Sequence, residues 1–482
     1  MFWRGVLGYL PANAAQGIVG LLAIVTFTRL LSPEDYGAYA LGFSAMSLCH
    51  TLVFTWMEVA MARFYAREAE GGKLADHFVT LYRSWFFAAV LFPVAAGLAL
   101  WLWPSHAEVK WAVTAGLASI PVRSLARLVQ ERRRAAGDVR AAALLDVAQT
   151  VGGFAIGAGL IVAGLKGAAP IAGLGAIAAL CLVFALPAEL KSLKGGRFDA
   201  VQARAYAAYG MPVAASLILA LALATTDRFL LGAYLNEAAV GVYHAGYSLA
   251  NRTLDVLFIW LGMAGGPAMV MALERGGRSA LEDAAKEQGA VMVAITLPAA
   301  VGLALVSRPL AEVMVGPALR EGAAAVTPWI AASAFFAGGT TYYLHQAFTL
   351  ARKTHLLLVA MAIPAAANVV LNLLLIPRYG LEGALWATTA SYALGAVASF
   401  ALGRRALALP FPTAALARAG VSSLAMAVVV GRIPEFGGVL ELGLKAAVGV
   451  LVYGALAAAL DVGGLRARGV RALSVLRPGV AA

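Results

Sequence analysis

Long apolar segments recur along almost the whole 482-residue chain, and no other sequence feature constrains its fold as strongly. A helix needs about 20 apolar residues to cross the hydrocarbon core of a bilayer. Stretches such as 291–306 and 356–376 contain no charged residue. They therefore lack the polar face that a helix of a soluble bundle presents to water. We expect an all-α integral membrane protein.

The same criterion predicts about 14 transmembrane helices. The predicted spans cover residues 6–31, 38–62, 84–103, 110–130, 141–165, 170–190, 207–234, 239–264, 288–307, 327–350, 356–377, 381–403, 414–431 and 438–460. An even number of spans places both termini on the same side of the membrane.

The charges indicate which side that is. The chain has 37 Lys and Arg against 25 Asp and Glu, a net charge of +12, although only 13% of its residues are charged. If the N-terminus is inside, 27 of the basic residues fall on the cytoplasmic side and 8 on the other. Basic residues are retained in cytoplasmic segments. We therefore expect both termini to be cytoplasmic, and we attribute the positive charge to orientation and to an anionic ligand, not to a nucleic acid.

Motifs for catalysis and metal binding are missing from the sequence. Cys49 and Cys181 lie in apolar runs and form neither a disulfide framework nor a zinc-binding spacing. The sequence contains no HExxH, GxSxG or P-loop lysine motif. We therefore expect no metal or cofactor, and not an enzyme.

An internal repeat divides the chain. GAYALGFS at 37–44 and GVYHAGYS at 241–248 share the pattern G-x-Y-x-x-G-aromatic-Ser at an offset of 204 residues. A weaker pair aligns Gly173 with Gly383 at an offset of 210. Six predicted spans separate the copies, so the two halves have the same orientation, as in transporters with parallel repeats.

The repeat predicts an N-terminal lobe at 1–206 with spans one to six, and a C-terminal lobe at 207–405 with spans seven to twelve. Residues 406–482 add two spans and a basic cytoplasmic tail. Two such lobes favour alternating access, with a substrate path between them near the middle of the membrane.

Three segments resemble a known family. RLLSPEDYGAYAL (29–41) resembles the first periplasmic turn of the polysaccharide transporters of the multidrug/oligosaccharidyl-lipid/polysaccharide (MOP) exporter superfamily. TTDRFLLGAYLNEAAVGVYHAGYSLA (225–250) resembles their seventh and eighth spans, and NVVLNLLLIPRYGLEGALWATTASY (368–392) their eleventh and twelfth.

The resemblance implies a flippase of the O-antigen type in the bacterial inner membrane. Such proteins move an undecaprenyl-diphosphate-linked oligosaccharide from the cytoplasmic to the periplasmic leaflet during surface polysaccharide biosynthesis. It also implies coupling to H+ or Na+, contact with membrane lipid, and cooperation with polysaccharide polymerase machinery. The alternatives are an ion-coupled multidrug exporter of the same superfamily, a lipid II flippase, and a membrane polysaccharide polymerase or ligase.

Polar and ionisable residues inside spans are costly, so they are candidates for these roles. The candidates for binding substrate or lining the cavity are Arg252, Arg123, Arg127, Arg63, Asn13, Gln16 and Asn251. The candidates for coupling or gating are His50, Glu58, Asp255, Asp227 and Arg228.

The arginines suit a diphosphate, but each has a second interpretation. Arg252 near mid-depth binds phosphate by exchange with Asp255, or forms a structural ion pair between helices. Arg123 and Arg127, one helical turn apart, receive the diphosphate in a cytoplasmic vestibule, or extend to the lipid headgroups. Arg63 lies at the inner mouth.

The remaining candidates also have alternatives. Glu58 couples a cation or lines the cavity, or it pairs with Arg63. His50 changes charge or contacts sugar, or it is a neutral hydrogen-bonding group. Asn13 and Gln16 line the cavity, or pack against a helix. Asp227 and Arg228 form a gate, or a pair between lobes.

Overall fold

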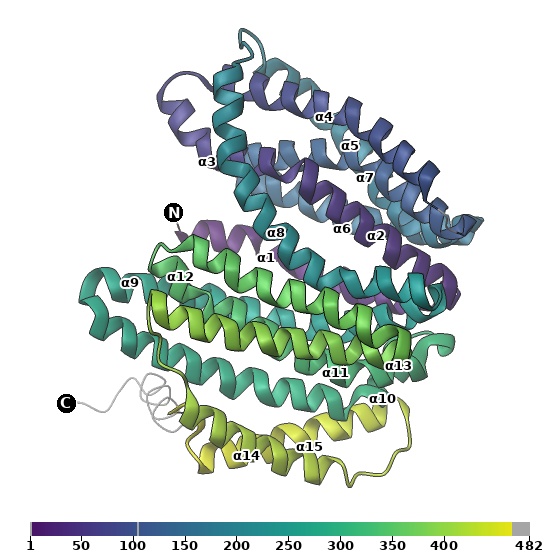
Figure 1. Ribbon diagram of the computed structural model, residues 1–482, viewed down its shortest axis with the longest axis vertical. Helices are drawn as coiled ribbons and strands as arrows, with labels where there is room; N and C mark the ends of the chain where they lie inside the picture. Colours follow the sequence, from purple (N-terminus) through teal and green to yellow (C-terminus); the bar gives the residue numbers. More distant parts are fainter. Residues whose placement is uncertain (1, 104–105, 465–482) are drawn as a thin grey trace, which may run out of the picture. The chain divides into compact units, whose positions relative to one another are not determined.

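The computed structural model describes residues 2–103 and 106–464, and over these ranges the chain is helical with no β-strand (Figure 1). Ten helical segments are long and apolar enough to cross a membrane, or 11 if one bent helix pair counts as a span. This confirms the all-α membrane class. The number of 14 spans stays a prediction, and the basic tail that was expected at the C-terminus lies outside the described residues from 465 onward.

The helices follow one another with short connections. They are α1 (Phe2–Leu30), α2 (Pro33–Val53), α3 (Thr55–Glu70), α4 (Leu74–Leu102), α5 (Ala107–Ala135), α6 (Val139–Leu160), α7 (Ala169–Ser192), α8 (Ala200–Tyr234), α9 (Glu237–Leu305), α10 (Ser307–Met314), α11 (Arg320–Gly339), α12 (Gln346–Leu350), α13 (Thr354–Ala406), α14 (Thr413–Val430) and α15 (Gly438–Ala459). Each of the 14 predicted spans falls on one or two of these helices.

Three helical segments are more than twice as long as a span, and each contains a break. Gly277 interrupts α9 with φ 64° and ψ −153°, and Gly380 interrupts α13 with φ 57° and ψ −131°. Glycine adopts these angles without the steric penalty of a side chain. A short π and 3₁₀ stretch at 161–168 separates α6 from α7. The breaks at Gly277 and Gly380 fall between predicted spans, whereas the stretch at 161–168 overlaps the end of the predicted span 141–165.

The chain divides into two compact units, Met1–His244 and Ala245–Ala482. The lobe boundaries inferred from the repeat, at 206/207 and 405/406, stay a prediction.

Small residues and ion pairs hold the first unit together. A Cβ atom on Gly173 of α7 would lie 2.4 Å from the backbone nitrogen of Gly157 in α6, so the two helices approach at backbone contact. At one end, Arg132 Nε of α5 lies 2.7 Å from the Glu189 carboxylate of α7. Arg134 lies 2.7 Å from Asp146 of α6. These contacts fix α5, the helix that supplies most of the site described below.

The second unit contains a buried ion pair on α15. Lys445 Nζ lies 2.6 Å from Glu441 Oε1 one helical turn earlier, and Glu441 also accepts hydrogen bonds from the backbone nitrogens of Phe436 and Gly437. The carboxylate therefore caps the start of α15, where the helix dipole favours negative charge.

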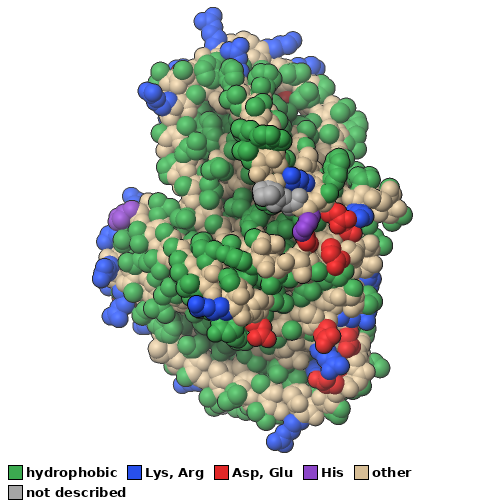
Figure 2. All heavy atoms as spheres, turned by 45° about the vertical axis from the view of Figure 1, so that its right-hand side comes forward, with side chains coloured by type: hydrophobic (Ala, Val, Ile, Leu, Met, Phe, Trp, Pro, Cys, Tyr) green, Lys and Arg blue, Asp and Glu red, His purple; other side chains and the backbone are tan. Residues whose placement is uncertain are grey.

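The surface is rich in hydrophobic side chains, as the low share of charged residues in the sequence leads one to expect. Figure 2 shows one face, on which hydrophobic side chains are the most widespread and charged side chains form separate clusters. On α4, the exposed side chains include Phe86, Leu91, Val94 and Trp101. Such a surface suits hydrocarbon, not water.

Candidate functional site

A break between α2 and α3 shapes the polar site of the first unit. Ser32 caps α2, accepting a hydrogen bond from the Asp35 backbone N–H (3.1 Å), and the helix runs to Val53. Phe54 (φ −114°, ψ −28°) separates the two helices, and α3 continues at an angle of 48°. The sequence predicts one unbroken span at 38–62, so this break is a correction. Phe54 is buried with its ring edge against Phe92, and this packing fixes the bend.

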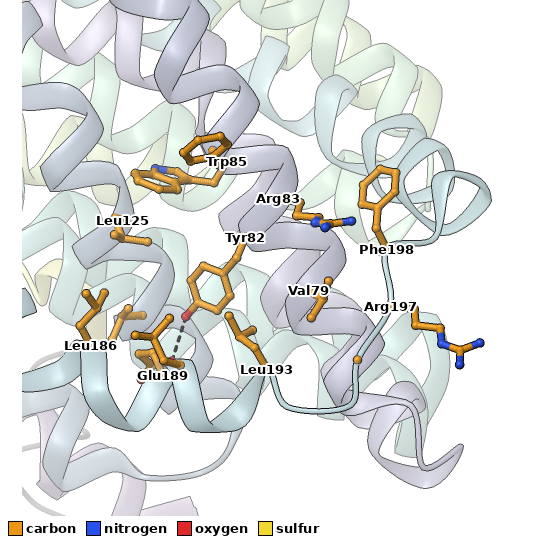
Figure 3. Close-up of a pocket in the computed structure, with 14 residues that line it drawn as sticks. Val79, Tyr82, Arg83, Trp85, Leu125, Leu186, Glu189, Leu193, Arg197 and Phe198 are labelled. Atoms are coloured by element: carbon orange, nitrogen blue, oxygen red, sulfur yellow. Dashed lines mark hydrogen bonds between the residues drawn. The ribbon is translucent and has the colours of Figure 1, made fainter.

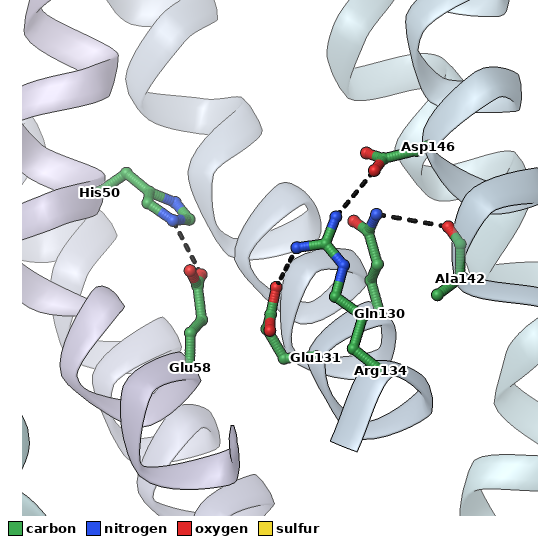
Figure 4. Close-up of polar contacts among 7 residues, drawn as sticks. All are labelled: His50, Glu58, Gln130, Glu131, Arg134, Ala142 and Asp146. Carbon is green, nitrogen blue, oxygen red and sulfur yellow. Dashed lines mark hydrogen bonds and ion pairs between the residues drawn. The ribbon is translucent and has the colours of Figure 1, made fainter. Parts of the chain in front are cut away.

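The His50 and Glu58 side chains meet across the break. His50 Nε2 lies 2.9 Å from Glu58 Oε1, and both side chains are less than one-fifth exposed (Figure 4). Glu58 belongs to the first turn of α3, where a negative charge is favoured by the helix dipole. The contact therefore links the end of α2 to the first turn of α3 at the bend.

Two adjoining cavities contain this pair. The first, of about 280 Å³, is lined by His50, Glu58, Arg123 and Arg127 together with side chains of α2, α3 and α5. The second, of about 480 Å³, shares Thr55 and Glu58 with the first and extends to Arg63, Glu131 and Tyr209. We call the two together the polar cleft. It brings five of the twelve candidates into one place.

The polar cleft has an excess of positive charge. Arg63, Arg123 and Arg127 form no ion pair with an acidic side chain among the described residues; Arg123 instead contacts Met46 Sδ at 2.5 Å, and Arg63 lies over the Tyr209 ring. Glu131 pairs with Arg134 at 2.6 Å (Figure 4), and Arg134 also pairs with Asp146. The three guanidinium groups therefore share the polar cleft with only two carboxylates, those of Glu58 and Glu131. Arginine donors arranged in this way suit phosphate oxygens.

The pairing of Glu58 with Arg63, one of two interpretations of this glutamate, is not found. Glu58 bonds to His50 instead, because the bend turns the first turn of α3 toward the end of α2. Arg63 is left free to stack on Tyr209 of α8, with its guanidinium 5.7 Å from the ring centre.

Four other candidates of the first unit lie elsewhere. Asn13 and Gln16 are exposed on α1. Asp227 and Arg228 are buried on α8: the Tyr243 hydroxyl donates to Asp227, and the Arg228 guanidinium donates to the Ala224 carbonyl at 3.0 Å. Asp227 therefore attaches α8 to the first turns of α9.

The last three candidates belong to the second unit. Asn251 Nδ2 donates to Asp255 Oδ2 at 3.4 Å, one turn along α9. Arg252 is exposed beside them, and within the described part of the chain it lies more than 4.0 Å from any carboxylate. The structural ion pair, one of the two interpretations of Arg252, is therefore not formed in this structure, and its role in binding stays a prediction.

Sequence reasoning missed two residues of the polar cleft, Tyr209 of α8 and Glu131 of α5, which line its second cavity. Neither gave a signal, since aromatic and charged side chains are common toward the ends of membrane helices. Over residues 2–103 and 106–464, no group of three or more His, Cys, Asp and Glu side chains is placed to hold a metal ion.

Comparisons with known proteins identify a family and a fold. Residues 26–321 match the family described as polysaccharide biosynthesis protein. No curated protein sequence matches the chain. Among solved structures, the fold is similar to that of the lipid II flippase MurJ in an inward closed conformation, with a TM-score of 0.75 at 15% identity, over 93% of this chain and 98% of that one.

Multidrug transporters share the fold as well. An inward-facing multidrug resistance MATE family transporter of the MOP superfamily gives a TM-score of 0.62 at 16% identity, over 82% of this chain and 93% of that one. An outward-facing MATE transporter gives 0.54 at 15% identity, over 83% and 94%. The molecule is a multi-pass membrane protein with a transporter fold.

Proposed function

Because this chain belongs to the family of polysaccharide biosynthesis proteins, we propose that it is a flippase for undecaprenyl-diphosphate-linked oligosaccharide. It moves the lipid-linked sugar from the cytoplasmic to the periplasmic leaflet of a bacterial inner membrane, for the biosynthesis of O-antigen or another exopolysaccharide. Both termini are cytoplasmic in this proposal, as the distribution of basic residues favours. The internal repeat favours alternating access as the mechanism.

The observation that carries the proposal is the charge of the polar cleft. Arg63, Arg123 and Arg127 form no ion pair with an acidic side chain among the described residues, yet they line cavities between apolar helices. Arg123 and Arg127 are half-buried, and keeping such charges inside a membrane protein is costly without a counter-charge. A diphosphate supplies that counter-charge and accepts several guanidinium hydrogen bonds at once.

His50 and Glu58 give the proposal a means of coupling to H+ or Na+. The pair bridges the bend between α2 and α3, so a proton or cation bound there changes the contact that holds the two helices at 48°. It also lies in the same cavity as Arg123 and Arg127, where an arriving anion alters its electrostatic environment.

An ion-coupled multidrug exporter is the second candidate, since MATE transporters share the fold. A cationic drug requires unpaired acidic side chains in its site. In the polar cleft Glu131 is bound to Arg134 and Glu58 to His50, whereas the three arginines are available. An anionic substrate is therefore favoured. A lipid II flippase carries a diphosphate too, and it differs from our proposal in the attached sugar.

The test uses proteoliposomes that contain the purified full-length protein and a fluorescent undecaprenyl-diphosphate oligosaccharide in both leaflets. A membrane-impermeant quencher reports the fraction in the outer leaflet, and a rise in the exchange rate over protein-free vesicles is expected. Deletion of the gene should also cause lipid-linked repeat units to accumulate on the cytoplasmic face.

Three results separate the alternatives. Exchange of lipid II at a higher rate than of the oligosaccharide lipid would make the chain a lipid II flippase. Uptake of a cationic dye without lipid exchange would make it a multidrug exporter. Lengthening of the lipid-linked glycan by the purified protein would make it a polymerase or ligase that works in the same machinery.

A further inference from the structure

The first unit has another cavity, which shares no lining residue with the polar cleft. It has a volume of about 730 Å³ and lies between α4, α5, α7 and the connection 193–199 (Figure 3). Most of its wall is apolar, with Leu186, Leu190 and Leu193 on the α7 side and Trp85 and Leu125 on the other. We call it the α4–α7 groove. Its walls suit a hydrocarbon chain, not a sugar.

The groove lies beside a helix that faces lipid. On α4, Phe86 is 56% exposed, Val94 72% and Trp101 78%, in a segment of high mean hydropathy. On α7, Leu190 is 57% exposed at the edge of the groove. Apolar side chains exposed on membrane-spanning helices contact acyl chains. Lipid therefore has direct access to the groove.

Two arginines give the groove a positive end. Arg83 and Arg197 line it and are exposed, and neither forms an ion pair with an acidic side chain in the described ranges. In Figure 3 both lie on the side of the groove where the connection 193–199 passes α4. That connection is held in place, because the Arg197 backbone N–H donates to Asp76 Oδ1 at 2.7 Å and that of Asp199 to Thr80 Oγ1 at 3.1 Å.

The single acidic residue among the lining side chains does not oppose this charge. Glu189 is buried, lies 2.7 Å from Arg132 Nε, and accepts a hydrogen bond from the Tyr82 hydroxyl at 2.9 Å. Its negative charge is therefore balanced inside the protein, and the charge presented to a ligand is that of Arg83 and Arg197.

We propose that the α4–α7 groove is a binding site for an anionic phospholipid of the surrounding bilayer. An acyl chain occupies the apolar wall, and Arg83 and Arg197 bind the phosphate. The charge complementarity favours an anionic headgroup, because a zwitterionic lipid brings a positive group to the same two arginines. A lipid bound to the folded protein stabilises it by mass action, here at a helix with few buried side chains.

Trp85 provides a direct probe. Its indole lines the groove and is fixed by a hydrogen bond from Nε1 to Ser124 Oγ at 2.9 Å. Phosphatidylglycerol brominated on its acyl chains is titrated into the full-length protein in detergent, and the same is done with the W85F variant. The difference between the two quenching curves isolates Trp85 from the other tryptophans. Saturable quenching is expected with phosphatidylglycerol, and much weaker quenching with brominated phosphatidylcholine.

Charge variants test the headgroup contact. The double variant R83Q/R197Q should weaken binding by about 30-fold, as expected for two basic groups near an anionic lipid. The matched control is R404Q/R405Q, which removes two exposed arginines at the end of α13 and should leave binding unchanged. Size-exclusion chromatography and thermal unfolding establish that both variants are folded.

Three outcomes would overturn the proposal. The first is equal Trp85 quenching by both brominated lipids, and the second is equal loss of binding in the two double variants. The third is displacement of phosphatidylglycerol by undecaprenyl phosphate at a lower concentration, which would make the groove a site for the substrate tail. None of these readouts depends on lipid exchange, so the proposal can fail while the proposed flippase function stands.

Discussion

Gly37 of α2 and Gly241 of α9 meet at backbone contact inside the first unit. A Cβ atom on Gly37 would lie 1.8 Å from the carbonyl oxygen of Glu237, and one on Gly241 would lie 2.2 Å from that of Pro33. Each glycine thus faces the carbonyl four residues before the other. The two glycines open the two copies of the sequence repeat, so equivalent segments of the repeat pack against each other symmetrically.

This crossing predicts that neither glycine tolerates a methyl group. Gly37→Ala or Gly241→Ala places a carbon inside the contact distance of a backbone oxygen, and overpacking of this kind costs about 1–3 kcal/mol. We expect each variant to lower the thermal unfolding midpoint in detergent by several degrees. Gly97→Ala on α4 is the control, because its Cβ would meet nothing within 4 Å. Equal midpoints for Gly37→Ala and Gly97→Ala would show that the helices do not cross this closely.

The Arg123 and Arg127 side chains should be needed for transport of a diphosphate lipid. Arg123→Gln and Arg127→Gln each remove donors to an anion, and a hydrogen bond to a charged group contributes about 1.5–3 kcal/mol. We expect lipid exchange in proteoliposomes to fall by about tenfold or more. Lysine at either position should restore part of the rate, since it keeps the charge and loses the planar fork.

Arg140→Gln is the matched control for these variants. Arg140 is exposed at the start of α6 and lines neither cavity of the polar cleft. It should exchange lipid at the rate of the unsubstituted protein. If Arg123→Gln and Arg127→Gln match it at equal protein levels in the membrane, the polar cleft does not bind the diphosphate.

His50 and Glu58 should act as one unit. Glu58→Gln and His50→Ala each disrupt the 2.9 Å contact across the bend, so each should slow lipid exchange by about tenfold. The double variant should be no slower than the single ones, because interacting residues are not additive. Glu70→Gln, at the exposed end of α3, serves as the control. Multiplied losses in the double variant would mean that the two side chains act independently.

The sequence predicted the helices well, because apolar length alone decides where a chain can cross a bilayer. It did not predict the bend at Phe54, where neither glycine nor proline marks the break. Because the bend was not predicted, the His50–Glu58 contact was not predicted either. Eight residues rise by about 12 Å along a straight helix, so the two side chains meet only when the helix bends.

The internal repeat also shows that a sequence pattern does not reveal which segments are in contact. The pattern around Gly37 and Gly241 established that the two segments are equivalent, but equivalence carries no information on whether they touch. Likewise, Arg123 and Arg127 were identified because charged residues inside a membrane span are costly and because they lie one helical turn apart. That Arg63 does not pair with Glu58 could not be predicted in this way, since it depends on the direction of the Glu58 side chain. Contacts between distant segments require the packed fold.

The His106 imidazole should titrate above its ordinary range. His106 precedes α5, and its Nδ1 lies 2.8 Å from Glu237 Oε1, so the hydrogen bond and charge of this carboxylate raise the pKa of the histidine above 6.5. A raised pKa means that the contact stabilises the fold at pH values below about 6.5 and that this contribution is lost as the pH rises through the pKa of the folded protein. NMR of histidine-labelled protein in detergent should show the raised value. Glu237→Gln should return the pKa toward 6.5, and an unchanged titration in that variant would contradict the contact.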